Sequence, residues 1–389
     1  MNTQDKSRDK KADFCINKSN LENIKSQYIM KKIFDNLSLK NILEFIKCNK
    51  SFQKKLNLNI DDYKNYSKIE IEIIPCLVDK KYNKFINIEP EDRAYFHIYF
   101  DNNIKEEEIN KYYLDDKNKI KKIKIIIDKE IKSFNGLFFD CNGIESISFN
   151  RFNRKKITNM SSMFYECKSL KEINFFNFNT SNVTNMSSMF AKCKSLKELN
   201  LTKLNTEKVT DMNNLFLECE SLEKINLSNF KTDNVIDMSF MFSQCSSLKE
   251  LNLSNFRTNN VTNMNNMFSY CKALKEIDLS SFNTFNVNKM NQMFHFCKSL
   301  KELNLSNFNT HNVSNMYCMF YECSSLEKIN LSNIDISNLT NMQLIFAYCP
   351  SLKEIKIPKL NISNVKDKGS MFYGCSDDFI MSIKSLIID

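Results

Sequence analysis

The sequence predicts an α/β repeat protein, a solenoid of stacked units that each hold one short parallel strand and one short helical turn. Three observations lead to this prediction. A Phe recurs every 26 residues, a Cys follows each Phe three residues later, and a Leu-x-x-Leu-x-Leu spacing, with Ile or Phe at some of its positions, follows each Cys except the last. Such a unit cannot bury its apolar face alone, so a fixed period indicates neighbours that stack and share one core.

The period holds through ten units. The Phe positions are Phe138, Phe164, Phe190, Phe216, Phe242, Phe268, Phe294, Phe320, Phe346 and Phe372. The Cys positions are Cys141, Cys167, Cys193, Cys219, Cys245, Cys271, Cys297, Cys323, Cys349 and Cys375. Strands of stacked units lie about 4.8 Å apart. Thiols aligned at that spacing converge on neither a metal ion nor a disulfide, so we expect them to be buried and reduced.

One unit shows how its residues divide. Leu199 and Leu201 alternate with polar neighbours, which is the period of a strand with one buried face. Met212 and Phe216 follow at a step of four, which favours a helical turn. Asp211 precedes that turn, and we expect it to act as the N-cap. The equivalent residues in other units are Asn185, Asp237, Asn263, Asn315 and Asn341.

The units over residues 120–375 resemble a known repeat family. Segments such as SLKELNLSNFNT and NVTNMNNMFSYC are similar to the BspA-like leucine-rich repeats of bacterial and protist proteins. The resemblance implies a curved leucine-rich-repeat solenoid with a strand-lined face that binds other proteins. Many members are described as surface proteins, so it also implies a cell-surface adhesin as an alternative. We expect residues 120–389 to form the solenoid and its terminal caps.

Three segments are expected before the solenoid. Residues 1–20 are polar and predict a disordered tail. Residues 21–62 show helical spacing, and the run YIMKKIFDNLSLKNILEFIKCNKSFQKKL resembles an F-box. An F-box implies a ubiquitin-ligase adaptor as partner and a substrate-receptor role for the repeats; the alternative is a simple helical subdomain. Residues 63–119 alternate apolar and polar side chains and predict a small β-rich region.

Polar strand positions should form columns on the solvent-facing side. One column carries amides that we expect to hydrogen-bond from unit to unit, with recognition of a ligand as the alternative. Its asparagines are Asn174, Asn200, Asn226, Asn252, Asn304 and Asn330. A neighbouring Lys-Glu pair is reversed in two units, Glu223-Lys224 and Glu327-Lys328. The reversal predicts opposite charges side by side along the column, which relieves repulsion.

Aromatic side chains replace the usual polar residue at several positions of the C-terminal half. These candidates are Phe240, Tyr270, Phe285, Phe296, His311, Tyr317, Tyr321 and Tyr348. Aromatic residues are enriched in the cores of protein interfaces. We therefore predict that they contact a protein partner; the alternative is scattered exposed aromatics without a binding role.

Composition and motifs weigh against other function classes. The net charge of +9, from 55 basic and 46 acidic residues, is spread along the chain, unlike the basic stripe of a nucleic-acid binder. No long apolar run predicts a membrane span, and the charged start predicts no secretory signal, so we expect an intracellular monomer, with the cell surface as the alternative. The three His residues and four Gly residues form no catalytic or phosphate-binding motif. We predict no enzyme, catalytic residue, metal or cofactor.

Overall fold

The fold is that of a computed structural model. The structure describes Lys54 and residues 68–76, 83–101, 103, 107–108, 111–114, 120–129, 131–152, 156–176 and 178–388. The chain divides into two units, residues 1–67 and 68–389, and the second is described here by itself. Apart from Lys54, the predicted tail and the F-box-like region, residues 1–20 and 21–62, lie outside the described residues.

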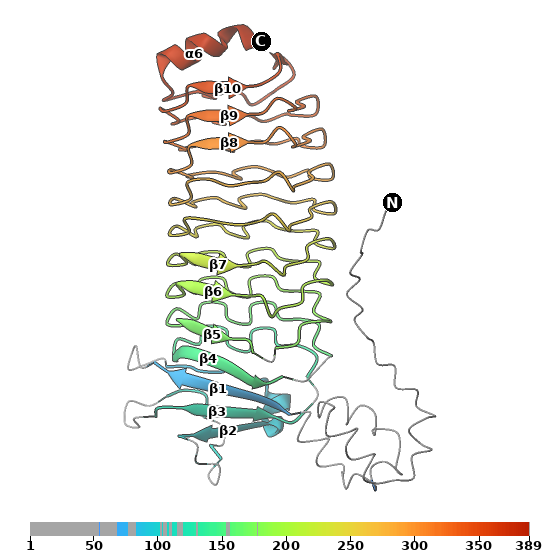
Figure 1. The fold of residues 1–389 in the computed structure, drawn as a ribbon, viewed down its shortest axis with the longest axis vertical. Helices are drawn as coiled ribbons and strands as arrows, with labels where there is room; N and C mark the ends of the chain where they lie inside the picture. Colours follow the sequence, from blue (N-terminus) through green and yellow to red (C-terminus); the bar gives the residue numbers. More distant parts are fainter. Residues whose placement is uncertain are drawn as a thin grey trace, which may run out of the picture. The chain divides into compact units, whose positions relative to one another are not determined.

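The second unit starts with a sheet that is antiparallel at first. Its strands are β1 (Ile69–Pro75), β2 (Phe96–Phe100), β3 (Ile123–Ile127), β4 (Ile144–Arg151) and β5 (Glu172–Asn174), and the 3-10 helix η1 (Pro90–Tyr95) precedes β2. The strand order is β2-β3-β1-β4-β5. β1 pairs antiparallel with β3 and β4, whereas β4 pairs parallel with β5. The parallel stack therefore grows from β4 (Figure 1).

The start of the stack differs from the expectation that it begins at residue 120. β3 pairs antiparallel with β1 and β2, and β1 lies between β3 and β4. The physical reason is that Ile69, Ile71 and Ile73 of β1 are fully buried, so β1 brings an apolar face that needs covering. Parallel bridging between coils begins with Ser133 and Asn159.

Among the described residues, six coils carry a strand of three residues, one above another along the stack (Figure 1). After β5 these are β6 (Glu198–Asn200), β7 (Lys224–Asn226), β8 (Glu302–Asn304), β9 (Lys328–Asn330) and β10 (Glu354–Lys356). Pairing is parallel and in register, so that Leu199 faces Ile225 and Leu303 faces Ile329. The predicted fold class, a leucine-rich-repeat solenoid with a 26-residue period, is confirmed.

A short closing segment covers the last coil (Figure 1). It comprises α6 (Asp377–Ile383), the 3-10 helix η2 (Lys384–Leu386) and the strand β12 (Ile387–Ile388), which pairs with β11 (Leu360–Asn361). The Ser376 hydroxyl accepts the N–H of Phe379 at 3.4 Å and caps α6. Phe379 and Ile383 are buried, and the Phe379 ring lies 6.1 Å from that of Phe372, so the segment shields the end of the core from water.

The second half of each coil is a series of tight turns, not the short helix that the spacing of three and four suggested. In one coil, the N–H groups of Met163, Tyr165 and Cys167 each donate to the carbonyl three residues earlier. The N–H groups that alternate with them, those of Ser162, Phe164 and Glu166, donate to carbonyls of the next coil. The turns therefore bring apolar side chains inward while every second N–H joins neighbouring coils.

Left-handed residues explain why the turns do not become a helix. Ser162 and Glu166 have φ angles of 53° and 60°, and the equivalent positions repeat along the array. A positive φ at the third residue of a β-turn gives type II geometry and stops a right-handed helix. The predicted cap forms, but on a turn: the Asp211 carboxylate accepts the N–H of Asn213 at 3.0 Å. Equivalent bonds are made by Asn185, Asp237, Asn263, Asn315 and Asn341.

Two buried ladders run through the core. Rings of the recurring Phe stack with centroids 5.1–5.9 Å apart from coil to coil. The Cys thiols are unpaired with one another, as predicted, and each from Cys167 onward donates to a Phe carbonyl of the preceding coil. Cys219 to Phe190 is one example, at 3.1 Å. Burial raises the pKa of Cys219 to about 12, so the thiol keeps the proton that it donates.

Candidate functional site

The solvent-facing strand positions form the first candidate surface. Glu198 and Asn200 are exposed on either side of the buried Leu199, and this alternation recurs. The expectation of amides bonded from unit to unit is wrong, because each amide oxygen accepts an N–H of its own coil two residues later. Asn200 accepts from Thr202 at 3.1 Å, which fixes the turn after the strand. The same local bond occurs at Asn174, Asn226, Asn252, Asn304 and Asn330.

The reversed charge pairs link neighbouring coils, as the sequence predicted. Lys224 Nζ lies 3.1 Å from a Glu198 oxygen, and Lys328 Nζ lies 3.1 Å from a Glu302 oxygen. Further pairs of this kind are Lys171–Glu145, Lys249–Glu223 and Lys353–Glu327. These pairs are exposed, so each contributes little to stability by itself. The order of Lys and Glu along the column also coincides with the places where neighbouring strands pair.

Strand pairing follows the order of these charges. β6–β7, β8–β9 and β9–β10 all pair across a step at which the Lys-Glu order is reversed. Three steps keep the order and stack like charges: Glu172 to Glu198, Glu250 to Glu276, and Glu276 to Glu302. None of these three steps carries strand pairing in the described part of the chain. Repulsion between like charges at facing positions accounts for this, although the reversed step from β7 to the next coil is also unpaired.

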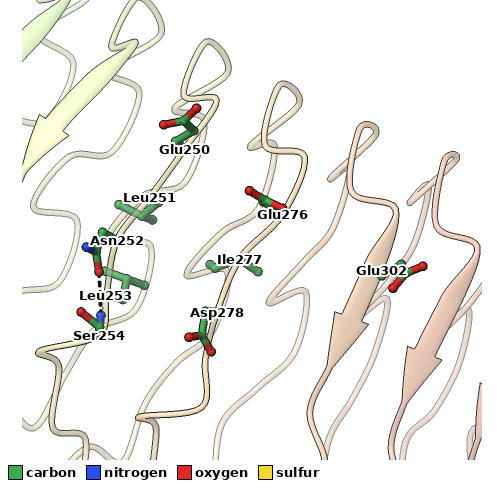
Figure 2. A pocket seen from close by; sticks show the side chains of 9 residues that line it. All are labelled: Glu250, Leu251, Asn252, Leu253, Ser254, Glu276, Ile277, Asp278 and Glu302. Carbon is green, nitrogen blue, oxygen red and sulfur yellow. Dashed lines mark hydrogen bonds between the residues drawn. The ribbon is translucent and has the colours of Figure 1, made fainter.

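The coils that lack strand pairing before β8 lie beneath a hollowed part of the strand face. Three hollows of about 290, 400 and 320 Å³ adjoin one another between Glu223 and Lys356, and we name them together the strand-face trough. Four carboxylates and the half-buried Ile277 line the central hollow (Figure 2). The carboxylates belong to Glu250, Glu276, Asp278 and Glu302.

Two of these carboxylates are available to a ligand. Glu302 is paired with Lys328, and Asp278 accepts hydrogen bonds from Ser280 that hold its pKa below its ordinary value. Glu250 and Glu276, in contrast, form no ion pair with any residue that the structure describes. The centre of the trough therefore offers two unpaired negative charges beside an apolar floor.

The second candidate surface lies on the turn edge of the C-terminal half. Five rings from successive coils, those of Tyr270, Phe296, Tyr321, Tyr348 and Tyr373, form a chain of contacts that we name the aromatic strip. Neighbouring centroids lie 4.5, 5.6, 5.3 and 5.2 Å apart. The structure thus brings together four of the eight predicted aromatic candidates.

Sequence reasoning missed two members of this surface. Tyr373 is 61 % exposed, and it lies two repeats after Tyr321 in the same column, a signal that the sequence contained. The ring of His295 lies 4.6 Å from Phe296 and 5.2 Å from both Tyr270 and Tyr321. Burial lowers the pKa of His295 to about 4, so its imidazole is a neutral part of the strip at pH 7.

The other four predicted candidates lie apart from the strip. Phe240 and Tyr317 are half-exposed, and Phe285 is 61 % exposed. His311 pairs with Asp335, with the His311 Nδ1 2.9 Å from a carboxylate oxygen. None of these four rings contacts a ring of the strip within the described residues. Phe285 and His311 are therefore exposed neighbours along their own column, without a ring contact between them.

Three strip residues occupy strained backbone. Tyr270, Phe296 and Tyr348 have φ angles of 60°, 60° and 58° at the position that Gly374 fills in the last coil. A bulky side chain in the left-handed region is an outlier that costs roughly 1–2 kcal/mol. Parallel stacking of Tyr270 on Phe296, at 4.5 Å and 7°, offsets part of this cost. The same left-handed φ occurs at this position in other coils, for example at Glu166, Lys192 and Glu218, so it belongs to the turn of the repeat and does not by itself mark a binding site.

Within the described ranges, no three His, Cys, Asp or Glu side chains are grouped so that they could hold a metal ion. In the same part of the chain, no helix has the length and apolar character that crossing a lipid bilayer requires.

Solved structures of bacterial leucine-rich repeat proteins show similarity to the chain. One from Bacteroides ovatus is 18% identical over 77% of this chain and 81% of its own, with a TM-score of 0.38. One from T. pallidum is 16% identical over 62% of this chain and 89% of its own, with a TM-score of 0.26. One from Eubacterium ventriosum is 15% identical over 60% and 83%, with a TM-score of 0.24. No curated protein matches the chain.

A family model matches most of the array. The model is described as "Mycoplasma protein of unknown function, DUF285", and it matches residues 132–250, 192–303 and 271–385. These overlapping matches cover the coils from the first parallel bridge to α6, which is more than half of the chain. The chain belongs to the DUF285 family.

Proposed function

We propose that this repeat scaffold binds proteins and holds an extended segment of its partner along the strand-face trough. The observation that carries the proposal is the opening of the strand face between β7 and β8. There the coils of residues 250–252 and 276–278 lack strand pairing, and a hollow of about 400 Å³ lies over them. In a repeat protein, function is expected where one unit departs from the others, because the common residues maintain the stack.

The chemistry of the trough fits a basic segment. Glu250 and Glu276 are unpaired, and the central hollow is lined by carboxylates without a Lys or Arg, whereas the chain as a whole carries a charge of +9. Lys or Arg side chains of a partner would pair with these carboxylates and gain specificity from the match. Ile277 offers an apolar contact between them. Binding of this kind needs no catalytic group, and the absence of enzymatic activity stays a prediction.

The test is affinity capture from the source cell with the full-length chain as bait. The variant Glu250→Gln/Glu276→Gln keeps the shape of both side chains and removes the charges. We expect at least about tenfold less captured partner, or roughly 1.4 kcal/mol of binding free energy. The matched control is Glu172→Gln, which removes a carboxylate at another unreversed step outside the trough. Equal capture by the variant and the wild-type chain would contradict the proposal.

A finer proposal concerns residues 21–62. The resemblance of this run to an F-box supports a role as a ubiquitin-ligase adaptor, with the repeats as substrate receptor. The test compares capture by the full-length chain and by residues 68–389. The shorter chain must start at 68 and not at 120, because β1 lies between β3 and β4. A ligase subunit that appears only with the full-length chain supports the adaptor role; capture of identical partners by both chains contradicts it.

The alternative function is that of a cell-surface adhesin, which rests on the resemblance to BspA-like repeats. We place the protein inside the cell, and labelling of intact source cells with an antibody to the solenoid separates the two locations. Staining without permeabilisation would favour the adhesin. Staining only after permeabilisation would favour the intracellular scaffold.

A further inference from the structure

The rings of the aromatic strip recur along the stack at a spacing that matches the turn of one kind of extended ligand. Its rings come from five successive coils, from Tyr270 to Tyr373. Coils of a parallel stack are about 4.8 Å apart, so two coils advance by about 9.6 Å. A polyproline II helix has three residues per turn and a rise of 3.1 Å, which gives about 9.3 Å per turn. One face of such a helix therefore meets a ring of the strip at every second coil.

The rings change orientation along the strip. Tyr270 and Phe296 are parallel, with 7° between their planes. Tyr321 and Tyr348 are inclined at 72°, and Tyr348 and Tyr373 at 84°. Two rings near a right angle can contact two sides of a pyrrolidine ring at once, whereas parallel stacked rings cannot. The C-terminal end, where Tyr348 and Tyr373 are 41 % and 61 % exposed, is therefore the stronger part of the surface.

The polarity of the strip fits the same ligand. Its rings carry Tyr hydroxyl groups, and the His295 imidazole among them is neutral at pH 7. Lys298 at its border is paired with Glu322 at 2.7 Å. A polyproline II segment has no internal hydrogen bonds, so its carbonyls can accept from the Tyr hydroxyls while its apolar rings pack on the aromatic faces. Its extended form exists before binding, which lowers the entropy lost on docking.

From this pitch, ring geometry and polarity we infer that the aromatic strip binds a proline-rich segment of a partner protein in the polyproline II conformation. This surface is separate from the strand-face trough: none of the residues that line the three hollows belongs to the strip. The inference therefore does not depend on the function proposed for the trough. A partner can occupy both surfaces or only one.

The test is titration of the full-length chain with a decaproline peptide, followed by calorimetry or by tyrosine fluorescence. We expect saturable binding that falls at least about tenfold in Tyr348→Gly/Tyr373→Ala. Glycine at position 348 also relieves the left-handed strain, so the variant is expected to fold with an unchanged or higher Tm. The matched control is Tyr165→Ala, in the same column as Tyr321 and Tyr373 but in the N-terminal half.

Each outcome separates this surface from the trough. Binding of decaproline that persists in Glu250→Gln/Glu276→Gln and in Tyr165→Ala, and is lost in the strip variant, supports the inference. No saturable binding, or equal binding by the strip variant and the wild-type chain, overturns it. A stronger response to a cello-oligosaccharide than to decaproline also overturns it, because the strip would then be a glycan surface.

Discussion

The strand face has two regions over the same core: a closed region, where neighbouring strands pair, and an open region, where they do not. β8, β9 and β10 pair in sequence, whereas the two coils before them, at residues 250–252 and 276–278, carry no strand. Yet the Phe rings and the Cys–carbonyl bonds continue unbroken beneath both regions. The core and the turn edge therefore hold the coils together, whereas three of the four unpaired steps of the strand face are steps that stack like charges.

The largest effect is expected from the part that both regions share. Phe268→Ala removes a ring beneath the open region, and Phe320→Ala removes one beneath the closed region; both rings are buried. Each change leaves a cavity, so each should lower the free energy of unfolding by about 3–5 kcal/mol. Denaturant titration measures both. A loss at Phe268 that is less than half of the loss at Phe320 would show that the open region is also loosely packed inside.

A smaller loss is expected from the thiol ladder. Cys271→Ala removes the bond from its Sγ to the Phe242 carbonyl, 3.2 Å long, together with some packing. The free energy of unfolding should fall by about 1–2 kcal/mol. Cys323→Ala is the matched change beneath the closed region and should cost the same. If either variant were as stable as the wild-type chain, the thiol bond would contribute nothing to joining the coils.

Exchanging two charges in the open region should let its strands pair. In Lys275→Glu/Glu276→Lys, the reversed order puts opposite charges beside Glu250 and Glu302, so the open region should pair. We expect slower hydrogen exchange at the backbone N–H groups of residues 251–279 and a Tm about 1–2 °C higher. The gain should fade at about 1 M salt, where the Debye length is about 3 Å. Unchanged exchange would mean that charge order does not keep the region open.

The smallest effect is expected on the turn edge, which is alike in both regions. Gln292 has a φ of 57°, so Gln292→Gly should relieve left-handed strain and raise the free energy of unfolding by about 0.5–1 kcal/mol. The control Gln292→Ala keeps a Cβ and should give no such gain. Thermal unfolding of the two variants measures the difference. A gain with Ala equal to that with Gly would assign the effect to the side chain and not to the backbone.

Prediction from the sequence was most reliable where one residue type repeats. The Phe and Cys columns gave the period, the parallel stack and the buried thiols, because each position has the same neighbours in every coil. It was less reliable for the local backbone. Spacings of three and four suggest a helix, yet the left-handed residues at Ser162 and Glu166 turn the same spacing into overlapping β-turns. Glycine fills these positions only at the two ends of the array, at Gly136 and Gly374, so the sequence carried no clear sign of them.

The sequence by itself determined the fold class, the 26-residue period and the buried ladders. It also determined the ion pairs between coils, such as that of Lys224 with Glu198. Only the tertiary structure placed β1 between β3 and β4, bonded the exposed asparagines to the backbone of their own coils, and joined Tyr270 to Tyr373 in one strip. The physical reason is the range of the interactions. Periodic burial can be seen in one unit, whereas strand insertion, sheet closure and ring contacts depend on residues that meet only after the coils have stacked.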